Sequence, residues 1–276
     1  PAGAEGFPTV VWFHGGGLTG GRREIPEELL AGGFAVAGVE YRLSPQTPVA
    51  GCLEDAAAAV AWVVRHIASY GGDPELIFLP GHSAGGYLVS MLGLDKRWLA
   101  AQGLDPDRAV AAVIPYSGQA VTHFTRRAEL GMPAGQPLVD DMAPLFHVRA
   151  DAPPMLLLSG DRELEMLGRY EENAYFWRML RIAGHPDVRL LEFDGYDHGN
   201  MPIPPPCATS AGGAIKYGTD DECETDAMGP AARAFRGGLD GLFAAEGGGG
   251  HGRSPLEGGD ERKDDDPRVL LRHGGR

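Results

Sequence analysis

Short apolar runs alternate with segments of helical periodicity up to about residue 202. Most of the runs lack strict alternation of apolar and polar positions, which is typical of parallel strands covered on both faces. Strands alternating with helices predict an α/β fold, a mostly parallel central sheet with helices on both faces. The predicted strands are Thr9–His14, Phe34–Tyr41, Leu76–Leu79, Val110–Pro115, Met155–Ser159 and Val188–Phe193.

Two segments between these strands have the spacing of amphipathic helices. In Cys52–Ser69, apolar residues recur every three to four positions, and Leu167–Ile182 has a similar pattern with a more polar face. Residues 118–150 break the alternation of strands and helices, because glycine, proline and charged residues are scattered along this segment. We therefore expect a short insertion of loops and short helices there.

The composition changes after residue 202. The last 74 residues hold 16 of the 42 glycines, and residues 257–276 carry mixed charge with almost no large apolar side chains. Such a composition buries too little apolar surface to offset the entropy of ordering. We predict a folded domain over residues 1–246, with one further helix at Met228–Phe243, and a disordered tail over residues 247–276.

Charge and cysteine content narrow the classes of partner. The chain has 24 Lys and Arg against 38 Asp and Glu, a net charge of −14, which repels nucleic acid and anionic membranes. No run of about 18 apolar residues could span a bilayer. Three cysteines without a CxxC pair indicate neither a disulfide framework nor zinc. We expect a soluble protein with small-molecule partners. Because Pro1 is not an initiator methionine, we expect a fragment or a processed form. The sequence does not determine its localisation.

The segment Gly81-His82-Ser83-Ala84-Gly85 matches the pattern Gly-x-Ser-x-Gly. In a glycine-rich chain the match alone is weak, but it directly follows a predicted strand and precedes a segment with helical spacing. This context places Ser83 on a sharp strand-to-helix turn, where a nucleophilic serine is presented. Small residues at 81 and 85 suit such a turn. An ordinary N-cap serine in a glycine-rich turn is the alternative.

Three consecutive glycines, Gly15 to Gly17, follow His14 at the end of the first predicted strand. Their N–H groups can turn toward one point, as stabilisation of a tetrahedral oxyanion requires. A phosphate-binding loop or a flexible turn is the alternative. Neither a Walker lysine nor a GxGxxG pattern follows, so the phosphate-binding loop is disfavoured.

A serine nucleophile needs a base and an orienting carboxylate, each just past a strand and in the order Ser, Asp or Glu, His. Asp161 follows the fifth predicted strand and His198 the sixth. We predict His198 as the base and Asp161 as the acid. Glu163 and Asp197 share the same two loops and remain alternatives for the acid.

Other polar residues near the strand ends are assigned to structure. Asp73 precedes a proline and is predicted to form a turn, and Arg42 is predicted to pair with Asp55. Weaker candidates for pocket residues are Gln119, Thr122, His123, Glu171, Glu172 and Asn173, for which solvated loop or helix positions are expected.

Together these motifs resemble the α/β-hydrolase superfamily, in its hormone-sensitive-lipase-like and feruloyl or acetylxylan esterase-like (BD-FAE-like) branches. The resemblance covers roughly residues 8–202. The segments that carry it are HGGG at 14–17, YRL at 41–43, GGDP at 71–74, GHSAGG at 81–86, SGD at 159–161 and DHG at 197–199.

The resemblance implies an α/β-hydrolase domain with Ser83 as nucleophile and Asp161 and His198 completing the triad. It also implies an oxyanion hole made by the N–H groups of Gly15, Gly16 and Ala84. Domains of this family usually begin with two further strands, which are absent from this sequence, and a closing helix is expected sooner after the histidine.

The predicted function is a serine hydrolase that cleaves carboxylic esters through an acyl-enzyme, with no metal and no organic cofactor. The insertion at 118–150 is too short for a large lid, so short-acyl or small carbohydrate or aromatic esters are expected as substrates. An amide hydrolase of the same fold, such as an arylformamidase or a prolyl-oligopeptidase-like peptidase, would use the same residues. A catalytically silent binding module is less favoured, because such modules usually lack part of the triad.

Overall fold

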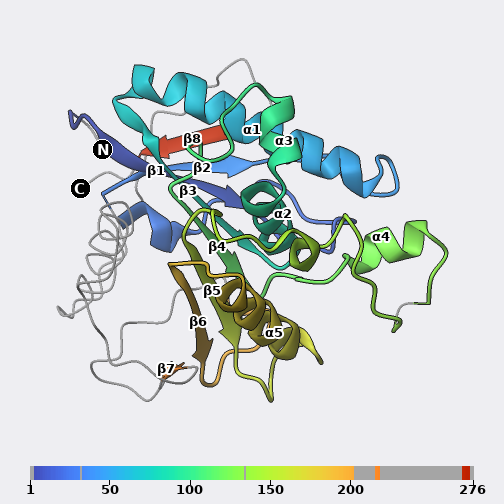
Figure 1. Cartoon of the computed structure of the whole chain (residues 1–276). Coiled ribbons are helices and arrows are strands. Elements are labelled where there is room, and N and C mark those ends of the chain that lie inside the picture. The colour runs from blue at the N-terminus through green and yellow to red at the C-terminus, as the bar shows by residue number, and fades with distance from the viewer. Residues whose placement is uncertain (1–2, 32, 134, 202–214, 218–268, 274–276) are drawn as a thin grey trace, which may run out of the picture.

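A computed structural model describes residues 3–31, 33–133, 135–201, 215–217 and 269–273. Eight strands form one sheet in the order β7-β6-β5-β4-β3-β1-β2-β8 (Figure 1). The six strands from β6 to β2 in this order are parallel, which confirms the predicted sheet. The strands are β1 (Phe7–Phe13), β2 (Ala35–Val39), β3 (Gly72–His82), β4 (Ala112–Tyr116), β5 (Met155–Gly160), β6 (Val188–Phe193), β7 (Ile215–Tyr217) and β8 (Val269–His273).

The helices follow the strands as the sequence pattern predicts, with additions in the connecting segments. The two predicted amphipathic segments form α1 and α5, and the insertion holds α4 and η3. The α-helices are α1 (Val49–His66), α2 (Ala84–Leu94), α3 (Lys96–Ala101), α4 (Phe124–Glu129) and α5 (Arg169–Ile182). The 3₁₀ helices are η1 (Glu27–Ala31), η2 (Ile67–Tyr70) and η3 (Pro144–His147). Among the described residues, none of these helices has the length and apolar composition that a membrane span requires.

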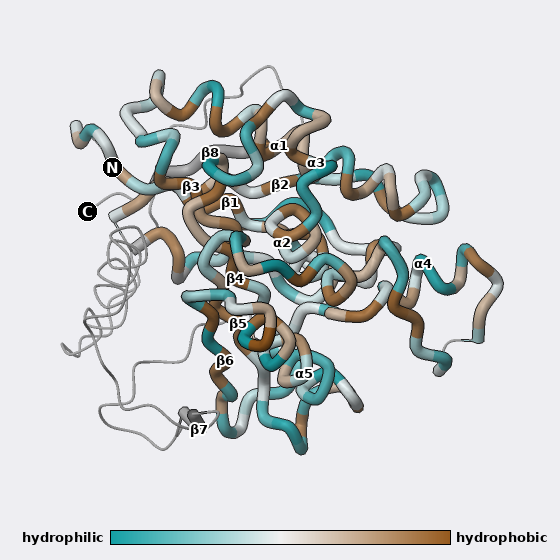
Figure 2. The backbone as a smooth tube through the Cα atoms, in the orientation of Figure 1, coloured by the Kyte–Doolittle hydropathy of each residue, from teal (hydrophilic) through white to brown (hydrophobic). Residues whose placement is uncertain are grey.

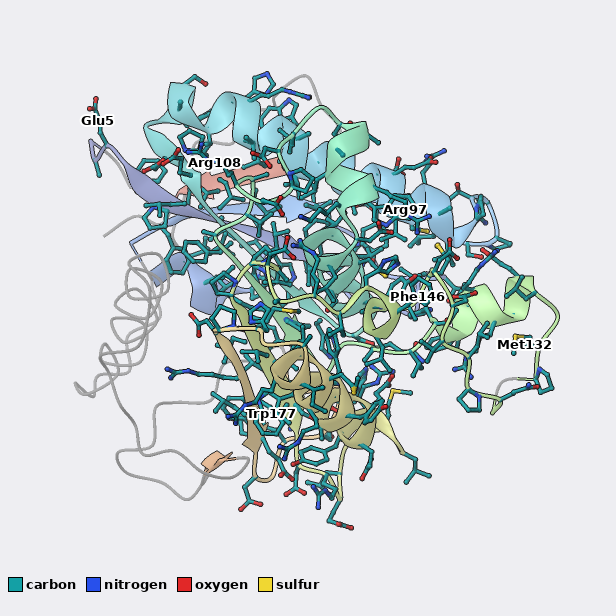
Figure 3. The ribbon with its side chains drawn as sticks, in the orientation of Figure 1. Glu5, Arg97, Arg108, Met132, Phe146 and Trp177 are labelled. Atoms are coloured by element: carbon teal, nitrogen blue, oxygen red, sulfur yellow. The ribbon has the colours of Figure 1, made fainter. Side chains whose placement is uncertain are left out.

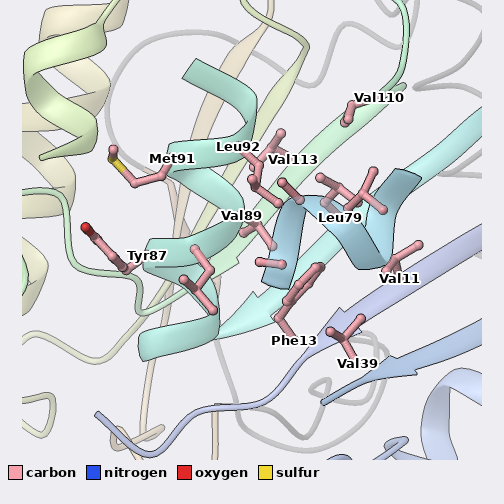
Figure 4. Close-up of a cluster of buried hydrophobic side chains, with 14 of the residues drawn as sticks. Val11, Phe13, Val39, Leu79, Tyr87, Val89, Met91, Leu92, Val110 and Val113 are labelled. Atoms are coloured by element: carbon pink, nitrogen blue, oxygen red, sulfur yellow. The ribbon is translucent and has the colours of Figure 1, made fainter. Parts of the chain in front are cut away.

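Both faces of the sheet are buried. Alternate residues of β1 point to opposite sides: Val11 and Phe13 pack in the larger cluster, with buried side chains of α1, α2, α3 and α5, part of which Figure 4 shows. Val10 and Trp12 pack on the other side, with side chains that include Leu29 of η1. The hydrophobic stretches accordingly follow the central strands (Figure 2). Burial on both faces explains why the strands lack apolar and polar alternation.

Two structural assignments made from the sequence are confirmed. The Asp73 carboxylate accepts a hydrogen bond from the Glu75 N–H at 2.8 Å, which forms the predicted turn. Arg42 binds the Asp55 carboxylate through two nitrogens, at 2.7 and 3.0 Å. Because Asp55 lies on α1, this pair fixes the segment after β2 to that helix.

Strand β8 lies in the segment whose composition predicted a disordered tail. It pairs antiparallel with the whole of β2, from Val39 opposite Val269 to Ala35 opposite His273. The prediction is therefore wrong for residues 269–273, because composition averaged over the tail hides a short apolar run that fits the open edge of β2. The rest of 247–276, and the helix predicted at Met228–Phe243, lie outside the described residues.

Deleting residues 269–276 is expected to lower the free energy of unfolding by about 2 kcal/mol and to promote aggregation, because the edge of β2 loses its hydrogen-bond partners. A deletion of residues 274–276, which leaves β8 in place, is the control. Urea unfolding and light scattering measure the two effects. Equal stability and solubility of both deletions would contradict the role given to β8.

Candidate active site

Ser83 lies on a strained turn between β3 and α2. Its backbone has φ +53° and ψ −110°, a region that non-glycine residues rarely occupy. A Cβ on Gly81 would lie 2.5 Å from the Gly85 backbone, and one on Gly85 would lie 2.1 Å from the Phe13 oxygen. Packing therefore demands glycine at both positions of the Gly-x-Ser-x-Gly pattern. The Ser83 side chain makes no capping bond to α2, which argues against an ordinary N-cap serine.

His198, in the loop after β6, directs its ring at this serine. Its Nε2 lies 2.8 Å from Ser83 Oγ, hydrogen-bond distance for removing the hydroxyl proton. The main-chain oxygen of His198 accepts a hydrogen bond from His82 Nε2 at 2.8 Å. Burial, with a smaller contribution from His198, lowers the pKa of His82 to about 4. His82 is thus neutral at physiological pH and holds the backbone of the histidine loop.

Glu165 contacts the other nitrogen of this imidazole. Its Oε1 lies 2.5 Å from His198 Nδ1, and its side chain is fully buried. Burial raises the pKa of Glu165, but hydrogen bonds from His198 and Ser117 outweigh it and lower the pKa to about 2. Glu165 is therefore a carboxylate at neutral pH, and Ser83, His198 and Glu165 form a continuous hydrogen-bonded series.

The structure corrects the predicted acid, because Glu165 rather than Asp161 contacts His198. After β5 the chain turns, and the Glu165 N–H donates to the main-chain oxygen of Asp161 at 2.7 Å. This turn brings the residue four positions beyond Asp161 back toward the sheet. The Asp161 carboxylate instead accepts hydrogen bonds from the N–H groups of Glu163 and Gly195, at 2.9 and 3.1 Å, and joins the loops after β5 and β6.

The two alternative acids are also placed elsewhere. Glu163 is exposed, and Asp197 accepts hydrogen bonds from the Gly199 and Asn200 N–H groups, both at 2.9 Å. The sequence motifs do not indicate Glu165, although one signal is present. It is a lone carboxylate among the apolar residues of Leu164-Glu165-Met166-Leu167.

The glycine loop after β1 lies beside the serine. A Cβ on Gly15 would lie 3.4 Å from the Ser83 Cβ, which places this backbone against the turn. Gly16 has φ +107°, and a Cβ there would lie 2.3 Å from the Gly20 oxygen, so only glycine fits. Ala84, the third predicted contributor to an oxyanion hole, is the first residue of α2. The structure thus places Gly15 against Ser83, with Gly16 next to Gly15 and Ala84 next to Ser83 in the chain.

Two side chains from other parts of the chain form hydrogen bonds with the backbone of this loop. The Tyr41 hydroxyl donates to the His14 main-chain oxygen at 2.7 Å, and the two rings stack at 4.2 Å. The Thr125 hydroxyl donates to the Gly17 main-chain oxygen at 2.5 Å. The loop is therefore fixed before any ligand arrives, as an electrostatic site requires.

The first 166 residues match the family model described as BD-FAE. The chain belongs to the BD-FAE family. This agrees with the resemblance to feruloyl or acetylxylan esterase-like α/β-hydrolases that the sequence motifs indicate.

Curated relatives of this BD-FAE chain carry esterase names. It is 32% identical over 205 residues to LipM of Mycobacterium tuberculosis, named "Probable carboxylic ester hydrolase LipM", and 29% identical over 211 residues to "Esterase LipQ" of the same organism. These matches cover 66% and 69% of this chain, and 47% and 50% of the relatives. The chain thus spans about half the length of the curated relatives that it matches.

Solved structures give the same fold. Esterase 2 of Thermogutta terrifontis, in its butyrate-bound form, is 26% identical, with a TM-score of 0.58 over 72% of this chain and 78% of that one. The same esterase is also described as phosphoramylated by tabun, at 25% identity and the same TM-score. The BD-FAE chain has the α/β-hydrolase fold that the motifs predict.

Several residues expected in solvated positions are buried in the BD-FAE chain. Gln119, Thr122, His123 and Asn173 are each at most 5% exposed, whereas Glu171 is exposed as predicted. Glu172 accepts hydrogen bonds from the N–H groups of Ala120 and Val121, at 3.0 and 3.2 Å. These polar groups contribute hydrogen bonds to the backbone of the loop after β4. The residue types along the sequence do not reveal these bonds.

Acidification is expected to weaken the fold through His123. Burial, with smaller contributions from Arg169 and Arg127, lowers the pKa of His123 to about 3. The unfolded chain takes up this proton near pH 6.5, so it binds more protons than the folded chain as the pH falls toward 3. Stability contributed by neutral His123 is complete above about pH 6.5 and decreases below it, by about 2 kcal/mol at pH 5.

His123→Asn tests this expectation. His123 Nδ1 accepts the Thr125 N–H at 3.2 Å, a bond that asparagine can also accept at the start of α4. Urea unfolding at pH 7 and pH 5 should therefore show a smaller difference in the variant, by about 2 kcal/mol. An equal difference in the two proteins would contradict the assignment.

Proposed function

We propose that this BD-FAE chain is a serine hydrolase that cleaves carboxylic esters through an acyl-enzyme. The observation that carries the proposal is the series of contacts from Ser83 Oγ to His198 Nε2 and from His198 Nδ1 to Glu165 Oε1, at 2.8 and 2.5 Å. A weakly nucleophilic hydroxyl becomes reactive when a base accepts its proton and a carboxylate orients that base. The esterase names of the relatives and structural neighbours support the same chemistry.

In the proposed reaction, His198 removes the proton of Ser83 as its oxygen attacks the ester carbonyl. The ester oxygen then carries negative charge, and the N–H groups of Gly15, Gly16 and Ala84 stabilise it. His198 gives the proton to the leaving alcohol, and the acyl group stays on Ser83. A water activated by His198 releases the acid. Glu165 keeps the Nδ1 proton in place and stabilises the imidazolium that forms.

The substrate class that we propose is a short-acyl ester or a small carbohydrate or aromatic ester. In the described part of the insertion at 118–150, the helices are the short α4 and η3, and Met132 lies at its far end, away from the sheet (Figure 3). Such a segment offers little surface to enclose a long acyl chain. The butyrate-bound structure of Thermogutta terrifontis esterase 2 shows a short acid held by a related fold.

An amide hydrolase of this fold would use the same side chains. The curated relatives and solved structures named above are esterases, which favours the ester. A panel of substrates separates the two: nitrophenyl esters of increasing acyl length, acetylated sugars, a feruloyl ester and an N-formyl aromatic amine. We expect the highest kcat/KM on short-acyl esters, with Ser83→Ala as the blank. Preference for the N-formyl amine would overturn the ester assignment.

A further inference from the structure

We propose that Ser117 is a positioning residue that fixes the Glu165 carboxylate for its bond to His198. The inference deepens the proposed function and rests on it. Ser117 follows Tyr116, the last residue of β4, and its side chain is fully buried. Its hydroxyl donates to Glu165 Oε2, while Oε1 of the same carboxylate contacts His198 Nδ1. With one oxygen held by Ser117, the plane of the carboxylate is set for the histidine.

The backbone of Ser117 is strained. Its φ is +46°, in the left-handed region that costs a non-glycine residue about 1 kcal/mol or more. Glycine would adopt this conformation without that cost. In the described part of the chain, the only other non-glycine residues with positive φ are Leu18 and Ser83, the proposed nucleophile. A strained serine whose hydroxyl contacts the acid therefore points to a role for the hydroxyl itself.

Neighbouring elements hold Ser117 in this conformation. Its N–H donates to the Leu158 oxygen of β5 at 2.7 Å, and its own oxygen accepts a hydrogen bond from Arg169 Nη1. Arg169 is only 4% exposed and is itself paired with Glu172, Nε to Oε1 at 2.8 Å. The Ser117 hydroxyl is thus placed by β5 and α5 rather than by Glu165 alone.

The same segment contacts the turn that carries the nucleophile. A Cβ on Gly86 of α2 would lie 2.7 Å from the Gly118 Cα, so these two backbones touch. Asn173 of α5 donates to the Gly118 oxygen at 2.8 Å. Ser117 and Gly118 therefore join the start of α2 to the loop that carries Glu165. This arrangement presets the distance between acid and nucleophile before substrate binds.

Loss of the hydroxyl should act on turnover rather than on binding. Without its second hydrogen bond, Glu165 can rotate, and His198 spends less time in the orientation needed for proton transfer. Because a bond to a charged group is lost, we expect kcat to fall about tenfold, with KM within about twofold of the wild-type value. Without the Ser117 hydroxyl, the negative charge of the carboxylate would also interact more strongly with the imidazolium. Because the protonated ring is then favoured, the acid limb of the profile of kcat against pH moves to higher pH.

Ser117→Gly separates positioning from structure, because it removes the hydroxyl and also relieves the strain. A purely structural Ser117 predicts a glycine variant as active as the wild type. Positioning predicts the tenfold loss and the shifted acid limb in both Ser117→Gly and Ser117→Ala, which retains the strain. Ser159→Ala is the matched control, since Ser159 is a buried serine near the end of β5 whose Oγ has no hydrogen-bond partner. Its activity should be unchanged.

A double-mutant cycle with Glu165→Gln completes the test. If Ser117 acts through Glu165, Ser117→Gly should cost about twofold or less in the Glu165→Gln background. An equal tenfold loss in both backgrounds, or wild-type kcat and pH profile in Ser117→Gly, would overturn the inference while Ser83→Ala remains inactive. Activity retained in Ser83→Ala would instead show that the proposed function fails, and the role of Ser117 with it.

Discussion

Ser83→Ala is expected to lower turnover of a short nitrophenyl ester by about four orders of magnitude or more. The hydroxyl that His198 activates at 2.8 Å is the atom that must bond to the substrate carbonyl, and alanine offers no replacement. Alanine at φ +53° bears a strain similar to that of serine, so the free energy of unfolding should change little. Steady-state kinetics and urea unfolding measure the two quantities on the same preparation.

Ser159→Ala serves as the matched control for this variant, since Ser159 is a buried serine near the end of β5 whose Oγ has no hydrogen-bond partner. It should retain wild-type turnover. Near-wild-type turnover in a folded Ser83→Ala protein would refute the assignment of the nucleophile.

Glu165→Gln is expected to lower kcat by about three to four orders of magnitude. The neutral amide cannot stabilise the imidazolium, and its NH₂ group can turn toward Nδ1 and favour the wrong tautomer. Asp161→Asn should cost about tenfold or less in kcat, with part of the effect in stability, because Asp161 accepts two backbone N–H groups and asparagine can replace only some of that capacity. Glu163→Gln, at an exposed position, should behave as the wild type.

Measuring the three carboxylate variants side by side decides which residue is the acid. A larger loss of kcat from Asp161→Asn than from Glu165→Gln would mean that the contact between Glu165 and His198 is not the catalytic one. Far-ultraviolet circular dichroism of each variant distinguishes the loss of a contact to His198 from the loss of the fold.

The parallel strands were predictable because burial on both faces leaves apolar runs that stand out from the helices. The element missed at the edge, β8, lies in a glycine-rich and charged segment whose average composition hides the run at Val269–Leu271. Strand pairing depends on an available edge, which is a property of the folded sheet and not of the local sequence.

The positions of Ser83 and His198 in the fold were predictable for a different reason. A Gly-x-Ser-x-Gly turn constrains its own backbone so strongly that its sequence signature is local, and His198 lies directly past a strand. The acid is less constrained. Chain order and topology select the loop after β5, but the turn that starts at Asp161 decides which carboxylate faces His198. The buried network of Arg169, Glu172 and Asn173 likewise appears only when α5 packs against the loop after β4.

Mass spectrometry of enzyme quenched in acid during turnover of nitrophenyl butyrate tests the acyl-enzyme most directly. We expect one butyryl group on the peptide that contains Ser83, at a level that follows the initial burst of nitrophenol, and no such group in Ser83→Ala. Rapid turnover by a protein that never carries the acyl group on Ser83, or carries it on another residue, would contradict the proposed mechanism.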